Sequence, residues 1–211
     1  MLIPEGEFTL GLNPQSTILQ FMSEKTSALN AQPEQQYFLE AFYIDQFEVT
    51  HEDFMKFKPQ AQYPIRQMHL PVSGVSWYEA DAYCHWIGKR LPMEYEWEKA
   101  ARGIHGRIFP WGNRFDPARL NSYEAGVRSA VAAGRYASGA SPYGVLDMAG
   151  NVWEWCEDKW NPTSTFRVLR GASRGSGDPD GLLSSYRGIY APVIRYVNIG
   201  FRCVLVGGSG G

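Results

Sequence analysis

The sequence has few cysteines, no long apolar run and no concentration of basic residues. Its three cysteines, Cys84, Cys156 and Cys203, are too few and too widely spaced for a disulfide framework or a zinc knuckle. We expect each of them to be a small buried apolar side chain. No run approaches the about 20 apolar residues of a membrane span. The N-terminus also lacks the basic and apolar regions of a signal peptide.

Several large functional classes leave patterns that this sequence lacks. Lys and Arg are scattered and the formal net charge is −2, so no basic stripe for nucleic acid is present. There is no Gly-rich phosphate loop and no Gly-x-Ser-x-Gly elbow. The four histidines are isolated, without a carboxylate at facial-triad spacing: His51, His69, His85 and His105. We expect no nucleic-acid partner, no direct membrane insertion and no cofactor.

Aromatic residues and turn formers, by contrast, are abundant. Aromatics make up 14% of the 211 residues, and 22 Gly and 13 Pro predict short elements joined by many loops. One helix begins at Ser76, which forms a capping box with Glu79, and ends near Gly88. The other predicted elements are helices over 51–57 and 93–102, strands over 4–12, 42–50, 152–158 and 200–206, and a surface loop over 13–36. We therefore predict a single α+β domain over 1–206 and a linker-like tail at 207–211.

Large side chains are expected to fill much of the core. The predicted core rings are Trp77, Trp86, Trp97, Trp111, Trp153 and Trp155. Glu154 lies between two of them. It is either a solvated strand residue or a buried partner of an arginine such as Arg170 or Arg202, and we favour the pairing.

Five motifs occur in a fixed order along the chain. They are PVSGVSWYEADAYCHWIGKRLPMEYEWEKAARG, FPWGN, SPYGVLDMAGNVWEWCED, RVLRGAS and IGFRCV. Over about residues 3 to 205 this order resembles the formylglycine-generating enzyme (sulfatase-modifying factor) family. The resemblance implies that family's variant of the C-type lectin fold, with two helices, short twisted sheets and much irregular loop.

The residues that carry the family's chemistry are missing. Catalytic members hold copper with two cysteines spaced C-x4-C after an RGGSW motif. Here the segment reads RGASRGSGDPDG, which places Ser176 and Gly181 at those positions. Neither residue can bind copper as a thiolate, so we expect a protein that is not an enzyme. The resemblance also implies a possible calcium site at Asn121 and Asn151, although Asn is common in turns for conformational reasons.

Residues 175–198 contain no Lys, Glu, Gln, Met or Trp, although these types account for 42 of the 211 residues. A second branch with this fold, the variable proteins of diversity-generating retroelements, offers an explanation. There, Asn codons are copied with errors at adenines, and the changed codons cannot encode those five residues. The resemblance implies a variable region over 174–203 with framing residues at Leu182, Ser184, Arg187, Pro192, Arg195 and 199–202. One departure is Arg174, where that branch usually has Trp.

The same resemblance implies which positions vary. They are Gly175, Ser176, Gly177, Asp178, Asp180, Gly181, Tyr186, Gly188, Ile189, Tyr190, Ala191, Val193, Ile194, Tyr196 and Val197. Leu183 is a further candidate, and Asn198 is interpreted as an unaltered template residue. A surface that changes must lie over a scaffold that is stable without it.

We predict a non-enzymatic protein that binds a protein or glycan ligand, as a receptor or attachment protein displayed on a cell or virus surface through a partner. Tyr186, Tyr190 and Tyr196 would be the anchors, since exposed Tyr with Gly and Ser is typical of binding surfaces. Alternatively, the nearby apolar side chains belong to the core: Ile189, Val193, Ile194 and Val197. Two other functions stay open. One is a formylglycine-generating type of oxidoreductase, or a relative that oxidises a protein or peptide by a different metal. The other is an inactive relative with an assembly role.

Overall fold

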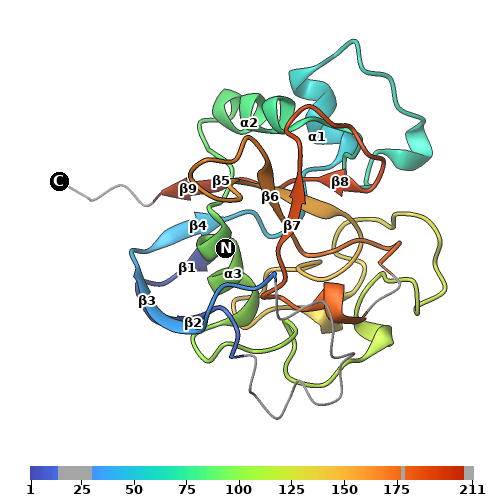
Figure 1. Ribbon diagram of the computed structural model, residues 1–211. Helices are drawn as coiled ribbons and strands as arrows, with labels where there is room; N and C mark the ends of the chain where they lie inside the picture. Colours follow the sequence, from blue (N-terminus) through green and yellow to red (C-terminus); the bar gives the residue numbers. More distant parts are fainter. Residues whose placement is uncertain (14–29, 177–178, 207–211) are drawn as a thin grey trace.

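The computed structural model describes residues 1–13, 30–176 and 179–206 (Figure 1). Gly177, Asp178, the tail at 207–211 and most of the predicted loop at 13–36 lie outside these residues. The described α-helices are α1 (His51–Phe57), α2 (Trp77–Trp86) and α3 (Glu94–Arg102). Short 3-10 turns occur at Ile65–Gln67, Pro117–Arg119, Ala137–Gly139 and Pro179–Leu182.

Three small sheets accompany the helices. The first has the order β1 (Leu2–Ile3), β4 (Phe42–Ile44), β9 (Val204–Val206), and it brings the first and last described strands together. The second pairs β2 (Gly6–Leu10) with β3 (Gln35–Leu39). The third has the order β7 (Gly188–Tyr190), β6 (Arg167–Arg170), β5 (Trp153–Lys159), β8 (Ile199–Gly200).

The helix boundaries follow the predicted capping signals. Ser76 Oγ accepts the backbone N–H of Glu79 at 3.3 Å, and Glu79 accepts the backbone N–H of Ser76 at 3.0 Å. Gly88 follows the helix with φ of 74°, in the left-handed region that favours glycine. At the start of α3, Met93 supplies no cap, and Asp158 of β5 instead accepts the N–H of Glu94 at 2.6 Å.

Several of the predicted element boundaries are wrong. The strand predicted over 200–206 is two strands, because β8 ends at Gly200 in the four-stranded sheet and β9 begins at Val204 in another sheet. The strand predicted over 4–12 is shortened to β2. Residues 35 and 36 belong to β3 rather than to a loop, because Gln35 and Gln36 pair with Leu10 and Thr9 of β2. The strand predicted over 42–50 ends at Ile44, because Thr50 already forms the N-cap of α1. The pairing of Gln35 and Gln36 depends on a strand distant in sequence, and β4 pairs with β9 only over residues 42–44.

The predicted ring-filled core is largely confirmed. Trp77, Trp97 and Trp155 are buried, and Trp153 packs partly against the core. Trp111 is half-buried. Trp86 is a correction, since 53% of it is exposed. Helix α2 turns the stripe Trp77, Ala80, Tyr83 and Cys84 inward, and Trp86 lies outside that stripe.

Buried ion pairs tie the C-terminal part of the chain to the centre. Arg202 contacts Glu154 through two hydrogen bonds of 2.6 and 2.7 Å, so the favoured pairing of Glu154 is confirmed with Arg202. Arg170 pairs instead with Glu98 of α3. Arg187 makes a further two-point contact with Glu94, at 2.5 and 2.9 Å. Such pairs satisfy buried charges only when both partners are present.

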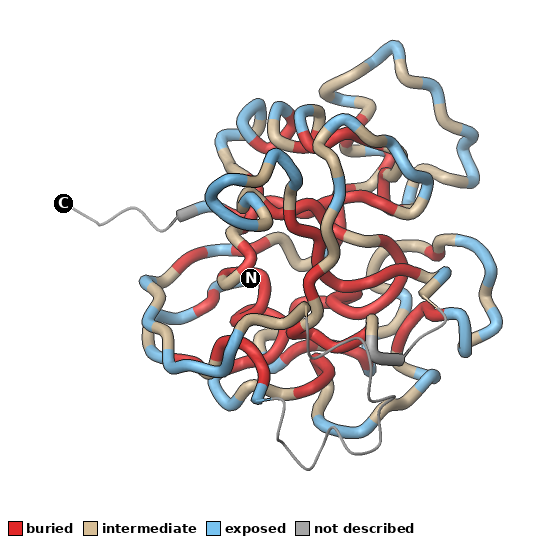
Figure 2. The backbone as a smooth tube through the Cα atoms, in the orientation of Figure 1, coloured by how far each residue is buried: buried red, intermediate tan, exposed pale blue. Residues whose placement is uncertain are grey.

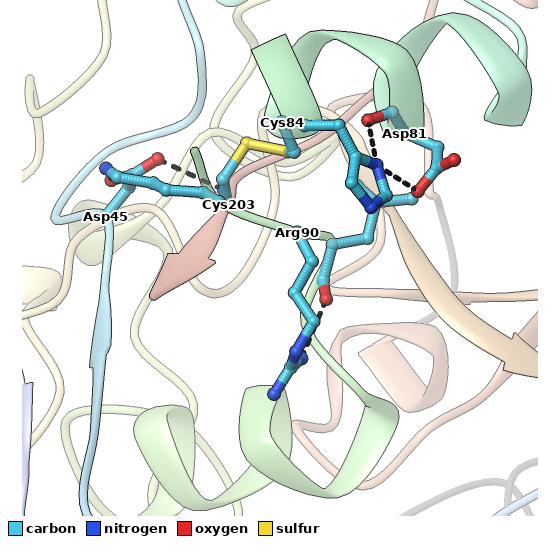
Figure 3. Close-up of a disulfide and its surroundings, with 8 residues drawn as sticks. Asp45, Asp81, Cys84, Arg90 and Cys203 are labelled. Carbon is cyan, nitrogen blue, oxygen red and sulfur yellow. Dashed lines mark hydrogen bonds and ion pairs between the residues drawn. A yellow bond between two sulfur atoms is a disulfide. The ribbon is translucent and has the colours of Figure 1, made fainter. Parts of the chain in front are cut away.

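Cys84 and Cys203 form a disulfide, which corrects the prediction that each is a separate apolar side chain (Figure 3). Their Cα atoms are 5.7 Å apart although 119 positions separate them in sequence. The bond joins α2 to the chain just before β9, beside Asp45, which accepts the backbone N–H of Cys203 at 3.1 Å. Cys156 is buried with a free thiol, as predicted.

Candidate ligand-binding surface

Residues 191–198, called the crossing loop here, connect two opposite edges of the four-stranded sheet. At one edge β7 pairs with β6, where Tyr190 lies opposite Arg167. At the other edge β8 runs parallel to β5, where Ile199 lies opposite Trp153. The loop passes beside the start of α2 on its way between them (Figure 1). Both of its ends are therefore fixed in one sheet.

Backbone carbonyls of the crossing loop receive hydrogen bonds from the scaffold. The N–H of Trp77 donates to the carbonyl of Pro192 at 3.0 Å, and the N–H of Gly74 donates to the carbonyl of Tyr196 at 3.0 Å. The Arg174 side chain donates to the carbonyl of Val197 at 3.0 Å. Every residue type has a carbonyl, so these contacts do not depend on the side chains at 196 and 197.

Two side chains of the loop, those of the framing residue Arg195 and of Asn198, also hold it in place. Arg195 forms an ion pair with Glu79 of the α2 capping box. Although burial raises the pKa of Glu79, hydrogen bonds from Lys58, Arg195 and Ser76 lower it to about 2. Asn198 donates to Ser173 Oγ at 3.1 Å. Glu79 is therefore an anionic anchor for this loop at neutral pH.

The predicted variable positions and the framing residues differ in burial (Figure 2). The exposed variable positions are Gly175, Tyr190, Val193, Tyr196 and Val197. The half-buried ones are Ser176, Gly181, Tyr186, Gly188, Ile189, Ala191 and Ile194. None of the variable positions whose side chains are described is buried. The buried framing residues are Leu182, Ser184, Arg187, Ile199, Gly200, Phe201 and Arg202, whereas Pro192 is half-buried and Arg195 is exposed.

The three predicted tyrosine anchors do not form one group. The rings of Tyr190 and Tyr196 meet edge to face, with centroids 5.4 Å apart, and both rings are largely exposed. Tyr186 instead lies 6.0 Å from the ring of Trp153, and its hydroxyl accepts a hydrogen bond from Asn30 at 3.2 Å.

The apolar side chains around the tyrosines also differ among themselves. Val193 and Val197 are 67% and 72% exposed, so the core alternative does not hold for them. Ile194 packs against the core cluster around Trp155. Leu183, the further candidate, is a buried core residue. The exposed apolar surface here is therefore formed by Tyr190 at the end of β7 and by Val193, Tyr196 and Val197 of the crossing loop.

Glycines in this segment show which positions leave room for a side chain. A Cβ atom added at Gly181 would meet nothing within 4 Å, and at Gly175 it would make one ordinary contact at 3.9 Å. At Gly188 it would lie 3.2 Å from Leu169 and Trp153. At the framing residue Gly200 it would lie 2.4 Å from the carbonyl oxygen of Val72. Space for substitution is therefore greater at 175 and 181 than at 188 and 200.

The positions that align with catalytic cysteines form no nucleophilic pair. Ser176 Oγ accepts the backbone N–H of Ser173 at 3.2 Å, and Gly181 has no side chain. Burial raises the pKa of the Cys156 thiol well above its usual value, which favours the unreactive thiol over the thiolate. Among the described residues, no three His, Cys, Asp or Glu side chains group closely enough to hold a metal ion.

Asn121 and Asn151, the candidate calcium ligands, lie together in the interior. Asn151 Oδ1 accepts hydrogen bonds from Asn121 Nδ2 and from the backbone N–H of Val131, both at 3.1 Å. Its Nδ2 donates to Glu48 at 3.0 Å, and its φ of 60° supports the conformational alternative. Asn121 Oδ1 has no hydrogen-bond partner in the described part of the chain, but one oxygen does not form a calcium site. The pair does not fit the ion, and we derive no role for calcium.

The sequence did not predict which scaffold residues hold the crossing loop. The capping box at Ser76 and Glu79 was recognised, but its second role as the partner of Arg195 was not. Arg174 was noted only as a departure from a pattern. Its side chain in fact bonds the loop at Val197. The unusual Arg at 174 was the signal that could have identified this contact.

In the part of the chain that the structure describes, no helix combines the length and apolar character needed to cross a membrane. The described residues form surface cavities of about 490, 580 and 240 Å³, and none of these is lined by residues of the segment 174–203. The candidate site is therefore an exposed face rather than one of these cavities.

Comparison with known proteins gives three findings. The profile described as "Sulfatase-modifying factor enzyme 1-like domain" matches residues 1–206. The uncharacterized protein YfmG of Bacillus subtilis is 31% identical over 266 aligned positions, covering 97% of this chain and 53% of YfmG. The inactive C-alpha-formylglycine-generating enzyme 2 of Mus musculus is 41% identical over 153 positions, covering 65% of this chain and 49% of that protein. The chain thus spans about half the length of these two relatives.

Among solved structures, Treponema denticola variable protein 1 superposes with a TM-score of 0.79 at 20% identity, covering 98% of this chain and 94% of that one. At this identity the likeness concerns the fold alone. It confirms the predicted α+β C-type lectin fold of the formylglycine-generating enzyme subtype. The described fold has a third, short helix, α1, in addition to the two implied by the resemblance.

Proposed function

This chain belongs to the family of sulfatase-modifying factor enzyme 1-like domains, and from that premise we propose that it is a non-enzymatic ligand-binding protein with a changeable C-terminal face. One observation carries the proposal. The crossing loop is held through backbone carbonyls and framing side chains, while Tyr190, Val193, Tyr196 and Val197 are exposed. Side chains that do not support the fold are free to serve recognition.

The arrangement favours binding over catalysis. Ser176 and Gly181 replace the thiolate pair of catalytic relatives, and the thiol of Cys156 is buried. The similarity to an inactive family member agrees with loss of the chemistry and retention of the scaffold. A copper-loaded preparation should therefore not convert a cysteine-containing sulfatase peptide. Turnover of that peptide would replace this proposal with the oxidoreductase alternative.

The changeable face suits a receptor or attachment protein whose ligand is a protein or a glycan. The fifteen proposed variable positions are fewer than the about 20–30 residues a side of a standard protein interface, so several copies displayed together would strengthen attachment by avidity. Retroelement mutagenesis is the proposed source of diversity. A near-copy of the segment with Asn codons, beside a reverse transcriptase gene, is the expected genomic context, and its absence would contradict this source.

The division between scaffold and face is tested by replacing side chains with asparagine, the presumed template residue. The combined variant Tyr190→Asn, Val193→Asn, Tyr196→Asn, Val197→Asn should keep its thermal midpoint within a few degrees, because surface changes usually alter stability by about 0.5 kcal/mol or less each. The matched control is Ile199→Asn, which buries an amide at 1% exposure and should unfold the protein. If the combined variant unfolds as the control does, the exposed residues hold the fold and the proposal fails.

A further inference from the structure

Tyr78 lies beside the crossing loop but outside the proposed variable segment. It is the second residue of α2 and is 56% exposed. The residue before it, Trp77, donates its backbone N–H to the carbonyl of Pro192 at 3.0 Å. The start of α2 is therefore in direct contact with the loop, and mutagenesis confined to residues 174–203 would leave Tyr78 unchanged.

Packing against Trp77 fixes the position of Tyr78 relative to the variable face. Its ring meets the ring of Trp77 edge to face at 5.5 Å. Trp77 is held by a hydrogen bond of 2.8 Å from Nε1 to the carbonyl of Cys156, and the guanidinium of Arg167 lies 3.7 Å from its ring centroid. Arg167 is opposite Tyr190 in the β6–β7 pair. Tyr78 and Tyr190 are thus both positioned relative to Arg167, Tyr78 through the ring of Trp77 and Tyr190 through the strand register.

We propose that Tyr78 is a fixed contact residue of the binding face, used whichever residues the variable segment carries. The inference rests on the proposed function, and it concerns a residue outside the proposed variable region. A tyrosine supplies a large rigid contact area at low entropic cost. The Tyr78 side chain is exposed, and its hydroxyl has no hydrogen-bond partner among the described residues. A constant anchor would give every variant a basal affinity on which the changing residues add specificity.

The chemistry of this face favours a protein partner with an apolar patch bordered by carboxylates. Val193 and Val197 offer no hydrogen-bonding groups, so these exposed side chains suit an apolar patch of a protein better than the hydroxyl-rich surface of a glycan. Arg174 bonds the loop at Val197 and Arg167 lies opposite Tyr190 in the β6–β7 pair, whereas the charge of Arg195 is already paired with Glu79. A partner with acidic groups around its apolar patch would complement the charge of Arg167 and Arg174.

The test uses two displayed libraries that differ only at position 78. In both, the exposed and half-buried variable positions are randomised, and the second library carries Tyr78→Ser. Each library is panned against ovalbumin, an acidic protein, and against immobilised mannan, a polysaccharide. The Tyr78 library should yield at least about ten-fold more ovalbumin binders. Introducing Tyr78→Ser into each selected binder should weaken it by about ten-fold or more, whatever its variable residues.

Tyr43→Ser is the matched control, because Tyr43 is 49% exposed on β4, in a different sheet from the crossing loop. It should leave the selected binders unchanged, and thermal midpoints verify that all variants fold. Equal yields from the two libraries would overturn the role of Tyr78 and leave the proposed function standing. Binders only to mannan would overturn the protein partner. No binders from either library would overturn both proposals, because the face would then lack recognition altogether.

Discussion

The interior around α3 and β5 and the crossing loop both use arginine–glutamate pairs, but in different surroundings. In the interior, Glu154 and Arg202 are both fully buried and held by several hydrogen bonds. At the loop, Arg195 is 56% exposed where it meets Glu79. A buried pair costs several kcal/mol when one partner is removed, whereas an exposed pair contributes about 1 kcal/mol or less. The same chemistry is therefore essential to the fold in one region and replaceable in the other.

The two regions also differ in what specifies their structure. Inside, particular side chains meet particular partners, so sequence and structure are tightly coupled. At the loop, carbonyl groups accept most of the bonds from Gly74, Trp77 and Arg174. We therefore expect that sequence can change there while the backbone keeps its path. The following experiments test this contrast.

The largest effect is expected for Arg202→Met, which would leave the Glu154 carboxylate buried without its cation. The loss in free energy of unfolding should be about 3–5 kcal/mol, measured by guanidinium chloride denaturation. The loop counterpart, Arg195→Met, should lose about 1 kcal/mol or less. Equal losses from the two variants would contradict the contrast between the regions.

Reduction of the Cys84–Cys203 disulfide should be the next largest effect. The bond links residues 119 positions apart in sequence. Its loss should lower the free energy of unfolding by about 2–4 kcal/mol, because the unfolded chain gains conformational entropy without the cross-link. Denaturation with and without dithiothreitol, on a Cys156→Ala background, measures the difference without interference from the free thiol. An unchanged midpoint under reducing conditions would show that the bond does not stabilise the scaffold.

Acid should stabilise the interior over a defined range. Burial, with the nearby Glu94 carboxylate, raises the pKa of Asp158 to about 6, from 3.8. The folded state therefore binds more protons than the unfolded state between these values, and the free energy of unfolding should rise as pH falls from about 6 to 4, by on the order of 2 kcal/mol. Asp158→Asn should flatten the profile in this range. An identical slope in the variant would exclude Asp158 as the cause.

Two glycines give the smallest and most local comparison. Gly200→Ala places a Cβ 2.4 Å from the Val72 carbonyl oxygen and should cost about 1–3 kcal/mol. Gly181→Ala enters open space and should change stability by about 0.5 kcal/mol or less. Thermal unfolding of both variants measures the difference. A larger loss at 181 than at 200 would reverse the assignment of changeable and framing positions.

Much of this fold could be predicted, because the sequence features that indicate it are either local, such as helix caps, or part of a recognised order of motifs. The capping box at Ser76 is of this kind, and so is the pairing of Glu154 with an arginine, although the sequence did not decide between Arg170 and Arg202. The disulfide could not be predicted, because a separation of 119 residues says nothing about distance in space. The same holds for β3, whose glutamines pair with a strand more than twenty residues earlier. At the site, the exposed residues could be predicted from the sequence. The hydrogen bonds from the backbone of Gly74 and Trp77 to the loop could not, because every residue except proline has a backbone N–H and no residue type identifies the donor.

The crossing loop joins two edges of the same sheet, with Tyr190 paired at one side and Ile199 at the other. The distance that the loop must span is therefore set by β6 and β5, which lie between β7 and β8. A substitution leaves the loop long enough to span this distance. An added or deleted residue would instead move Pro192 away from the N–H of Trp77, or Ile199 out of its register with Trp153. Any process that diversifies this stretch must conserve its length, and point errors in copying meet that requirement where insertions and deletions do not.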